Sequence, residues 1–332
     1  MASFEETGPS TPVTEATRVD KVHPRARLLH NVRAVIVLGL SLVLLIPVMA
    51  MALTAFKSRA EVVSVPPNYI FEPTLEGFVF LLTERSQMTE AAQHEARQNM
   101  DELSLFERIA LESGQRINGP SDFVRRLRNS LIIAGGSTFF SVTLGLLAAY
   151  AFSRFDIPGK GDLLFFILST RMLPAVVVAV PLFLMYRQLN LHDSHVGMII
   201  LYTVFNLSLT VWLLKGFIDE IPREYEEAAL VDGYSRWQAF YKIVLPQAST
   251  GIAATTVFAL IFAWNEYAFA LMMTSDRART APPAIATMLG RGGIEWSAIA
   301  AGTLAFLIPV VIITFALRRH LLRGVTFGAI RQ

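Results

Sequence analysis

Four consecutive residues, Trp264 to Tyr267, bring two aromatic rings, an amide and a carboxylate into a long apolar stretch. Aromatic faces can stack on sugar rings, and amide or carboxylate groups hydrogen-bond to hydroxyls. The order Trp264-Asn265-Glu266-Tyr267 therefore predicts contacts with a sugar or polyol. The alternative interpretation is hydrogen bonding between helices by Asn265 and Glu266, with the rings as an interfacial anchor.

Three further polar residues lie within apolar stretches and are weaker candidates for the same pathway. Polar groups at membrane depth are costly, so they usually face the interior of a helical bundle or a water-filled cavity. These residues are Arg171, Tyr202 and Asn206. The alternative for Arg171 is an ion pair with a carboxylate such as Glu266.

The sequence has few residues for catalysis, metal binding or nucleotide binding. The chain has no cysteine, which excludes disulfides, thiolate metal sites and a catalytic thiol. The stretch "HDSH" at 192–195 offers two histidines without a third ligand, and "PGKGD" at 158–162 lacks the spacing of a phosphate-binding loop. We therefore expect no enzyme activity, no bound metal or other cofactor, and no ATP hydrolysis by this chain.

The elements that must position these residues are apolar. Of 332 residues, 53% are hydrophobic and 17% are charged, and the apolar residues gather into blocks near twenty residues long. Such blocks match the hydrocarbon thickness of a bilayer, whereas the alternating segments of a barrel are absent. The sequence predicts an all-α membrane protein with six spans, at about 33–56, 130–152, 163–186, 196–217, 250–273 and 297–317.

Arginine and lysine are unevenly distributed over the flanks of these spans. They are concentrated at 25–33, 154–160, 215–242 and 318–323, and are sparser on the opposite side. The positive-inside rule then places both termini in the cytoplasm. The first block, Val32 to about Phe56, is too long for a signal peptide and is read as a retained helix. A net charge of +2 is too small to indicate nucleic acid.

The predicted organisation follows from these spans. It comprises a cytoplasmic tail at 1–32, a first span at 33–56, an external loop at 57–128, a five-helix core at 129–320 and a cytoplasmic tail at 321–332. In the external loop, Leu103, Phe106 and Ile109/Ala110 recur at helical spacing. They predict an amphipathic helix that is either a solvated or interfacial lid or a docking surface for an external partner.

Two patterns within the spans concern packing. Pro174 and Pro181 lie seven apart in the third span, on one face, and each frees a backbone carbonyl. A helix that lines a cavity and a kink buried in protein are both consistent with them. Small residues recur every fourth position in the second span and predict close helix packing: Ser137, Ser141, Gly145 and Ala149.

The polar loop at 218–247, between the fourth and fifth spans, predicts two short helices around Gly233. Pro222 suits the first turn of the first helix, and Gly233 suits a left-handed residue at its end. One face of this helix is formed by Tyr225, Ala228, Ala229 and Asp232.

The second helix of the loop is expected to start at a capping box, Ser235 with Gln238, and to close at Pro246. Its Arg236 and Lys242 are isolated among aromatic residues, so a DNA-reading helix is disfavoured. An apolar stripe outside the bilayer needs a partner. The stripe consists of Trp237, Phe240, Tyr241 and Val244, and we expect it to pack on this protein's own helix ends.

The spacing Glu227-Ala228-Ala229, Gly233, Ile243, Leu245-Pro246 resembles the cytoplasmic coupling loop of ABC-importer permeases. The segment 86–116 does not match and looks like an insertion, and the closing "RQ" departs from the usual ending. Six further stretches resemble the maltose-permease-like carbohydrate subfamily: "PPNYIFEPTLEGF" at 66–78, "NSLIIAGGS" at 129–137, "AAYAFSRF" at 148–155, "MLPAVVVAVPLF" at 172–183, "AWNEYAFAL" at 263–271 and "LLRGVTFGAI" at 321–330.

The resemblance implies a type I ABC-importer permease fold in a bacterial inner membrane, with a coupling helix–turn–helix between spans four and five. It implies a second homologous permease, two cytoplasmic ATPase subunits that bind ATP and Mg, and an external solute-binding protein. Glu227 would pair with an ATPase arginine, and the tail from Gly324 would reach between the ATPase subunits. The implied coupling residues are Glu226, Glu227, Ala228, Ala229, Asp232, Gly233, Ile243, Leu245 and Pro246.

The function that follows is a permease subunit of an ATP-driven, binding-protein-dependent importer for a carbohydrate or polyol, working by alternating access. Movement of the coupling helix would carry spans three to five with it. The alternative is a secondary transporter or channel for a small polar solute. That class predicts inverted repeats with broken spans in corresponding positions, which the sequence does not show. Sugar, sugar alcohol and glycerol all stay open as substrates.

Overall fold

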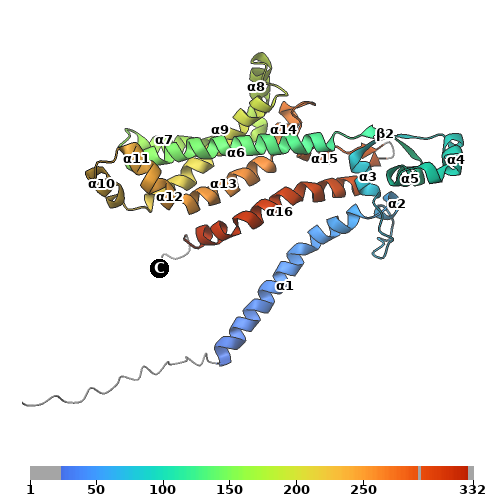
Figure 1. Cartoon of the computed structure of the whole chain (residues 1–332), viewed down its shortest axis with the longest axis horizontal. Helices are drawn as coiled ribbons and strands as arrows, with labels where there is room; N and C mark the ends of the chain where they lie inside the picture. The colour runs from blue at the N-terminus through green and yellow to red at the C-terminus, as the bar shows by residue number, and fades with distance from the viewer. Residues whose placement is uncertain (1–23, 291–292, 328–332) are drawn as a thin grey trace, which may run out of the picture. The chain divides into compact units, whose positions relative to one another are not determined.

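The computed structural model describes residues 24–290 and 293–327, and it is largely helical (Figure 1). The chain divides after Ala50 into two units, which are described separately. The first holds most of α1 (Pro24–Ala55), the helix predicted as the first span. Of the predicted tails, residues 1–23 and 328–332 lie outside the described residues, while 321–327 continue the last helix.

The described helices account for six spans, as predicted, when two bent helix pairs are included. Four single helices are long and apolar enough to cross a membrane: Asn31–Ala55 of α1, α6 (Phe123–Arg154), α9 (His195–Asp219) and Trp296–Ala316 of α16 (Trp296–Phe327). In the first bent pair, Lys160–Met172 meets α8 (Ala175–Gln188) at an angle of 93°, and Lys160–Met172 itself comprises α7 (Lys160–Ser169) and η2 (Thr170–Met172). In the second bent pair, Arg236–Gln247 meets α13 (Ser249–Trp264) at an angle of 73°.

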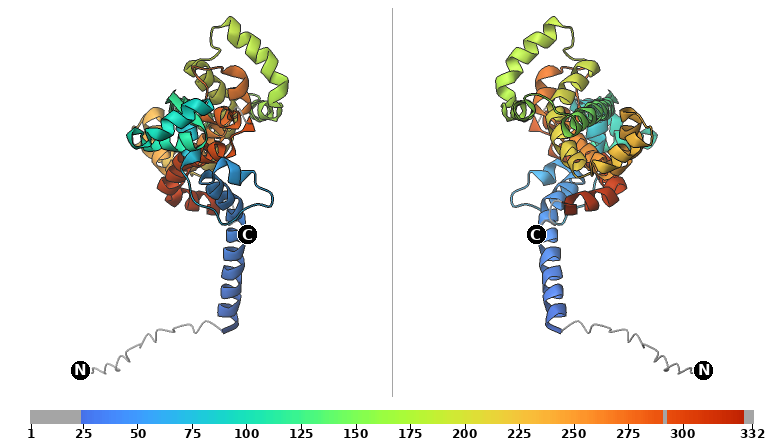
Figure 2. Two further views of the ribbon diagram at one scale, coloured as in Figure 1. Left: turned by 90° about the vertical axis from the view of Figure 1, so that its right-hand side faces the viewer. Right: turned by 90° about the vertical axis from the view of Figure 1, so that its left-hand side faces the viewer.

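The predicted third span, 163–186, is therefore two helices rather than one. The break lies at Leu173, whose backbone is extended at φ −69° and ψ 125°. Proline disfavours a helical conformation in the residue before it, so Pro174 ends one helix and begins the next. Pro181 lies inside α8 without a break. α8 projects from the rest of the second unit, at the top of Figure 1, and is yellow-green in Figure 2.

The small-residue stripe of α6 packs against α9, as the sequence predicted, and the two helices run side by side in Figures 1 and 2. Thr210 Oγ1 donates to the carbonyl of Ser141 at 2.9 Å. A β-carbon on Gly145 would lie 2.4 Å from Thr210 Oγ1, which is closer than atoms can approach. The glycine is required because the backbone of α6 lies directly against the Thr210 side chain of α9 here.

The segment predicted to be external is more elaborate than the amphipathic helix that the sequence predicted. Strands β1 (Thr83–Gln87) and β2 (Gln115–Pro120) pair antiparallel and enclose the segment at its base. Leu103 is extended, and the Ser104–Glu107 capping box starts a new helix after it. Between the strands lie α4 (Glu90–Gln98), η1 (Met100–Glu102) and α5 (Leu105–Glu112).

The remaining elements connect these parts. They are α2 (Arg59–Val62), α3 (Glu76–Leu82), α14 (Ala268–Met273), α15 (Ala281–Ala286), β3 (Leu289–Gly290) and β4 (Gly293–Ile294). The predicted fifth span, 250–273, is interrupted because α13 ends at Trp264 and α14 begins at Ala268. This interruption contains three of the four residues that the sequence singled out first.

Replacing Gly145 with leucine is expected to force α6 and α9 apart and to destabilise the protein by about 1–3 kcal/mol, the usual cost of overpacking. The matched control is Gly135→Leu on the same helix, because a β-carbon there meets no atom within 4 Å. Thermal melting of the two purified variants in detergent measures the difference. Equal melting temperatures would contradict the close packing of these helices.

Candidate functional site

The loop between the fourth and fifth predicted spans folds as two short helices around a turn, as expected. α10 (Glu224–Val231) is followed by Gly233, which adopts the predicted left-handed conformation at φ +87°. Ser235 and Gln238 form the predicted capping box at the start of α11 (Arg236–Ala239). Pro222 lies before α10 rather than in its first turn.

The face of α10 that turns inward is not the one that the sequence predicted. Glu226 and Ala229 are buried, and Tyr225, Ala228 and Asp232 are exposed. The predicted face grouped Ala229 with the other three because the four positions have the helical spacing i, i+3, i+4 and i+7. In the structure, the exposed surface instead combines Tyr225, Glu227, Ala228 and Asp232 with Val231, which is 88% exposed.

Glu226 is held inside the protein by residues at the end of α6. Its carboxylate forms an ion pair with Arg154 and accepts from the Tyr150 hydroxyl at 2.8 Å. The Arg154 and Glu226 side chains are only 6% and 9% exposed. Arg154 also donates to the carbonyls of Ile218 and Ile221 at 3.1 and 2.9 Å. The sequence did not predict this cluster.

The predicted apolar stripe of the second helix divides into two halves. Phe240 and Val244 are buried against the ends of α6 and α9, as expected. Trp237 and Tyr241 are 65% and 62% exposed, so that half of the prediction is wrong. Tyr241 lies in η3 (Phe240–Val244), a π-helical segment whose wider turn rotates residues away from the face that α-helical spacing assigns to them. Trp237 precedes this segment, in α11.

The other predicted coupling residues lie after this segment. Ile243 and Leu245 are half-buried, and Leu245 packs on the same apolar cluster as Val244. Pro246 is exposed and lies within α12 (Leu245–Gln247), where the chain bends towards α13. It therefore lies at the bend, close to where the sequence placed the helix end.

Four of the seven predicted pathway residues line one cavity of about 220 Å³. Arg171 comes from η2, Tyr202 and Asn206 from α9, and Glu266 from the break between α13 and α14. The Arg171 guanidinium lies over the ring of Phe262, 4.3 Å from its centre. Within the described residues Arg171 forms no ion pair with Glu266, so the predicted pairing is wrong.

Glu266 is fixed in the cavity by three hydrogen bonds. Its carboxylate accepts from the Tyr202 hydroxyl at 2.7 Å and from the backbone N–H groups of Phe269 and Ala270 at 2.8 and 3.0 Å. A carboxylate is favourable at the N-terminus of a helix, here α14, because the first N–H groups have no partner within the helix. The break in the chain thus positions a charge at the cavity wall.

The remaining three pathway candidates lie outside the cavity. Trp264 is 3% exposed, and its ring stacks on Phe306 of α16 with the centroids 4.7 Å apart. Asn265 and Tyr267 are exposed, and the Asn265 amide donates to the carbonyl of Ile261. The backbone turns after Trp264, so four consecutive residues point to different surroundings.

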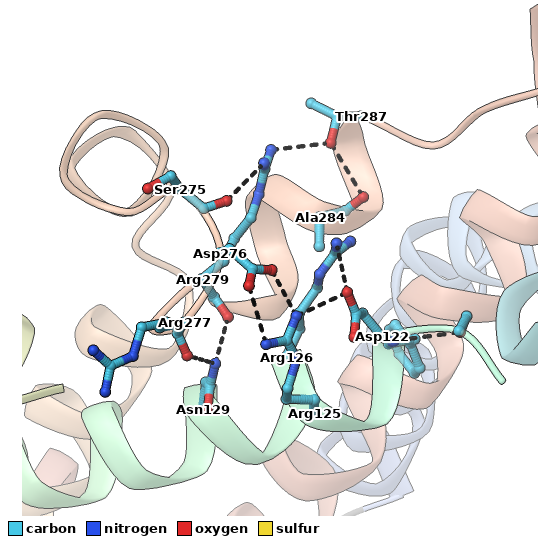
Figure 3. A network of polar contacts seen from close by, with 12 residues as sticks. Asp122, Arg125, Arg126, Asn129, Ser275, Asp276, Arg277, Arg279, Ala284 and Thr287 are labelled. Atoms are coloured by element: carbon cyan, nitrogen blue, oxygen red, sulfur yellow. Dashed lines mark hydrogen bonds and ion pairs between the residues drawn. The ribbon is translucent and has the colours of Figure 1, made fainter. Parts of the chain in front are cut away.

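A second polar network lies at the Phe123 end of α6 (Figure 3). The Asn129 amide donates to the carbonyls of Arg277 and Arg279 at 2.9 and 3.0 Å. Arg125 pairs with Asp276 at 2.6 Å. These contacts fasten the α14–α15 connection to α6. Sequence reasoning missed them because most of the bonds go to backbone groups about 150 positions away.

Asp193 also holds the α14–α15 connection, through hydrogen bonds from the backbone of that connection. Its carboxylate accepts from the backbone N–H groups of residues 275–278, at 3.0 to 3.3 Å. Burial acts to raise the pKa of Asp193, but these backbone donors outweigh it and hold the pKa below its usual range. His195 hydrogen-bonds to Asn129. "HDSH" is thus structural, and the described residues contain no group of three metal-ligating side chains.

Comparison with known proteins gives consistent matches. A model of the family "Binding-protein-dependent transport system inner membrane component" matches residues 141–327. A probable ABC transporter permease of Sinorhizobium fredii is 31% identical over 88% of this chain and 92% of its own length. A trehalose transport system permease of Mycobacterium tuberculosis is 37% identical over 63% and 77%.

Solved structures include a similar fold. A chain from a bacterial ABC transporter involved in alginate import is superimposable with a TM-score of 0.61. The match covers 89% of this chain and 97% of the alginate-transporter chain, at 19% identity. The likeness is one of fold, and it agrees with the type I ABC-importer permease fold that the sequence resemblance implied.

Replacement of Asp193 with asparagine is expected to lower the melting temperature at pH 7 by about 2–4 °C. Asparagine tolerates the left-handed backbone of Asp193, at φ 52°, so the loss reflects the carboxylate. Because the folded-state pKa lies below the unfolded value, the stabilisation is present above pH ~4 and is lost as the pH falls through the folded-state pKa.

Melting of wild type and Asp193→Asn at pH 7 and at about pH 3 tests this linkage. The gap between the two proteins should narrow at the lower pH, because part of the stabilisation is lost below the unfolded-state pKa. Asp101→Asn, which changes an exposed carboxylate in the external segment, is the control and should show no gap at either pH. A gap for Asp193→Asn that is equally large at low pH would contradict the role of the ionised carboxylate.

Proposed function

This chain belongs to the family of binding-protein-dependent transport system inner membrane components, and we propose that its substrate is a carbohydrate or polyol. Within that family the chain is a permease subunit of an ABC importer, and it is a transport component rather than an enzyme. The proposal extends to the residues that couple transport to ATP hydrolysis and to those that contact the substrate.

The observation that carries the coupling role is the geometry of α10. The helix is anchored from within by Glu226, and it exposes Glu227, the small Ala228 and the apolar Val231 on its outer surface. An exposed apolar side chain beside a carboxylate suits a groove with a basic residue. We assign this surface to a cytoplasmic ATPase subunit, with Glu227 paired to an ATPase arginine. ATP and Mg would then bind to the partner, and no cofactor to this chain.

The assembly proposed around this chain has two ATPase subunits, a second permease and an external solute-binding protein. The uneven distribution of arginine and lysine supports an orientation with both termini in the cytoplasm. In that orientation α10 faces the ATPase subunits. The segment from β1 to β2 lies outside, on the side where the solute-binding protein delivers its substrate.

The substrate class rests on the cavity and on the relatives. Arg171, Tyr202, Asn206 and Glu266 supply hydrogen-bonding groups at the cavity wall, and Phe262 supplies an aromatic face. Such a combination suits hydroxyl-rich molecules. Similar permeases are named for trehalose, trehalose/maltose and sulfoquinovosyl glycerol. Of the seven candidates from the sequence, these four are the ones we propose as substrate contacts.

Reversing the charge at Glu227 is expected to disrupt docking of the ATPase. Glu227→Arg should lower the ATPase that co-purifies with the permease, and the uptake that depends on it, by about tenfold or more. Asp156→Arg is the matched control, because it reverses an exposed carboxylate at the same end of the helical bundle but outside α10. Normal co-purification and uptake with Glu227→Arg would argue against α10 as the docking surface.

The substrate class is tested in two steps. A thermal-shift screen of the cognate solute-binding protein against sugars and polyols should identify a stabilising ligand from one of these classes. Tyr202→Phe, which removes a bond to Glu266, is then expected to reduce uptake of that ligand about 3- to 10-fold. Ser208→Ala removes a hydroxyl from the same helix outside the cavity and serves as control. A ligand from another chemical class would refute the proposal.

A further inference from the structure

We propose that Arg154 and Glu226 form the link through which movement of α10 reaches the membrane helices, and that α6 carries this movement to the opposite end of the bundle. The inference rests on the proposed docking of the ATPase at α10. It adds two positioning residues and a direction of transmission, neither of which the coupling pattern in the sequence contains.

The Arg154–Glu226 ion pair is buried and connects α6 to α10. Arg154 is the last residue of α6, and all of its described contacts are inside the protein: the Glu226 carboxylate and the carbonyls of Ile218 and Ile221. The Tyr150 hydroxyl donates a hydrogen bond to the second carboxylate oxygen of Glu226. Breaking a buried pair leaves a charge without compensation, so separation of α10 from α6 is strongly disfavoured. α10 and the end of α6 are therefore expected to move together.

A second set of contacts fastens the start of α10 to both helices. Arg223 donates to the carbonyl of Ser153 at 2.7 Å, and the Ser153 hydroxyl donates to Asp219 of α9 at 2.5 Å. The aromatic ring of Phe240 packs on Tyr150 with their centroids 4.6 Å apart. Both sides of the turn at Gly233 are thus attached to the same end of the α6–α9 pair.

α6 is suited to carrying displacement over the width of the membrane. It has 32 residues without proline, which corresponds to a length of about 48 Å. At Gly145 its backbone lies so close to Thr210 of α9 that a β-carbon would not fit. At its far end, Asn129 and Arg125 hold the α14–α15 connection. One helix therefore joins the coupling loop to the opposite surface of the bundle.

The two bent helix pairs are the places where the rest of the bundle can change its angle relative to α6 and α9. Tyr202 and Asn206 lie on α9 and move with the fastened pair, whereas Arg171 lies in η2 beside the 93° bend and Glu266 follows α13, which begins at the 73° bend. A shift of α6 and α9 relative to these segments changes the cavity between them. The fastened helices are the second and fourth predicted spans, and the proposal has these two, rather than spans three to five, move with the loop.

The test uses the complete importer in proteoliposomes, with the loaded solute-binding protein, and measures substrate imported per ATP hydrolysed. The variants are Glu226→Gln, Arg154→Gln and the double variant. Each single change is expected to lower this ratio about tenfold while the ATPase still co-purifies. The double variant, in which no charge is buried alone, is also expected to lose about tenfold, because the two residues act as one unit.

Asp156→Asn is the control, since it removes an exposed charge two residues after Arg154 that takes no part in either set of contacts. It should change the ratio less than about twofold. Normal ratios in the single variants overturn the inference. A loss in the double variant near the product of the two single losses also overturns it. A normal ratio in the double variant overturns it too, because the single losses would then come only from the unpaired buried charge. Failure of the wild type to co-purify the ATPase would instead refute the proposed function.

Discussion

The close approach of α6 and α9 is the contact on which both ends of the molecule depend. At Gly145 the two backbones are separated by little more than a threonine hydroxyl, which bonds to a carbonyl across the interface. In lipid, apolar side chains gain little by leaving their surroundings, so association relies on such close packing and on interhelical hydrogen bonds. Because the pair is rigid, groups at its two ends and the cavity-lining residues of α9 share one frame.

The sequence predicted the spans and the local conformation of the coupling loop, because those depend on short-range rules. Gly233 takes the left-handed conformation that the turn requires, and Ser235 caps its helix. It did not distinguish Glu226 from Glu227. Neighbouring glutamates on a polar helix have the same composition and propensity. Only Arg154, 72 positions earlier, decides which of them is buried.

The candidate cavity was predictable in part for the same reason. The residue types were correctly chosen, but their grouping assumed a continuous helix through Trp264 to Tyr267. The helix ends at Trp264, and the new N-terminus of α14 captures Glu266. Likewise Pro174 indicated a kink, yet the bend of 93° depends on tertiary packing as well as on the proline. Local rules identify where a helix can break, and long-range contacts set where its parts then point.

The two ends of α6 use the same device, in which a side chain binds backbone groups of a neighbouring segment. Arg154 donates hydrogen bonds to the carbonyls of Ile218 and Ile221, and Asn129 donates to those of Arg277 and Arg279. Bonds to the backbone hold a segment without using its side chains, which remain on the surface for other partners. An importer that must both transmit movement and bind separate subunits needs this division. α10 itself is held through one buried side chain, that of Glu226, and it can therefore still expose Val231 almost completely.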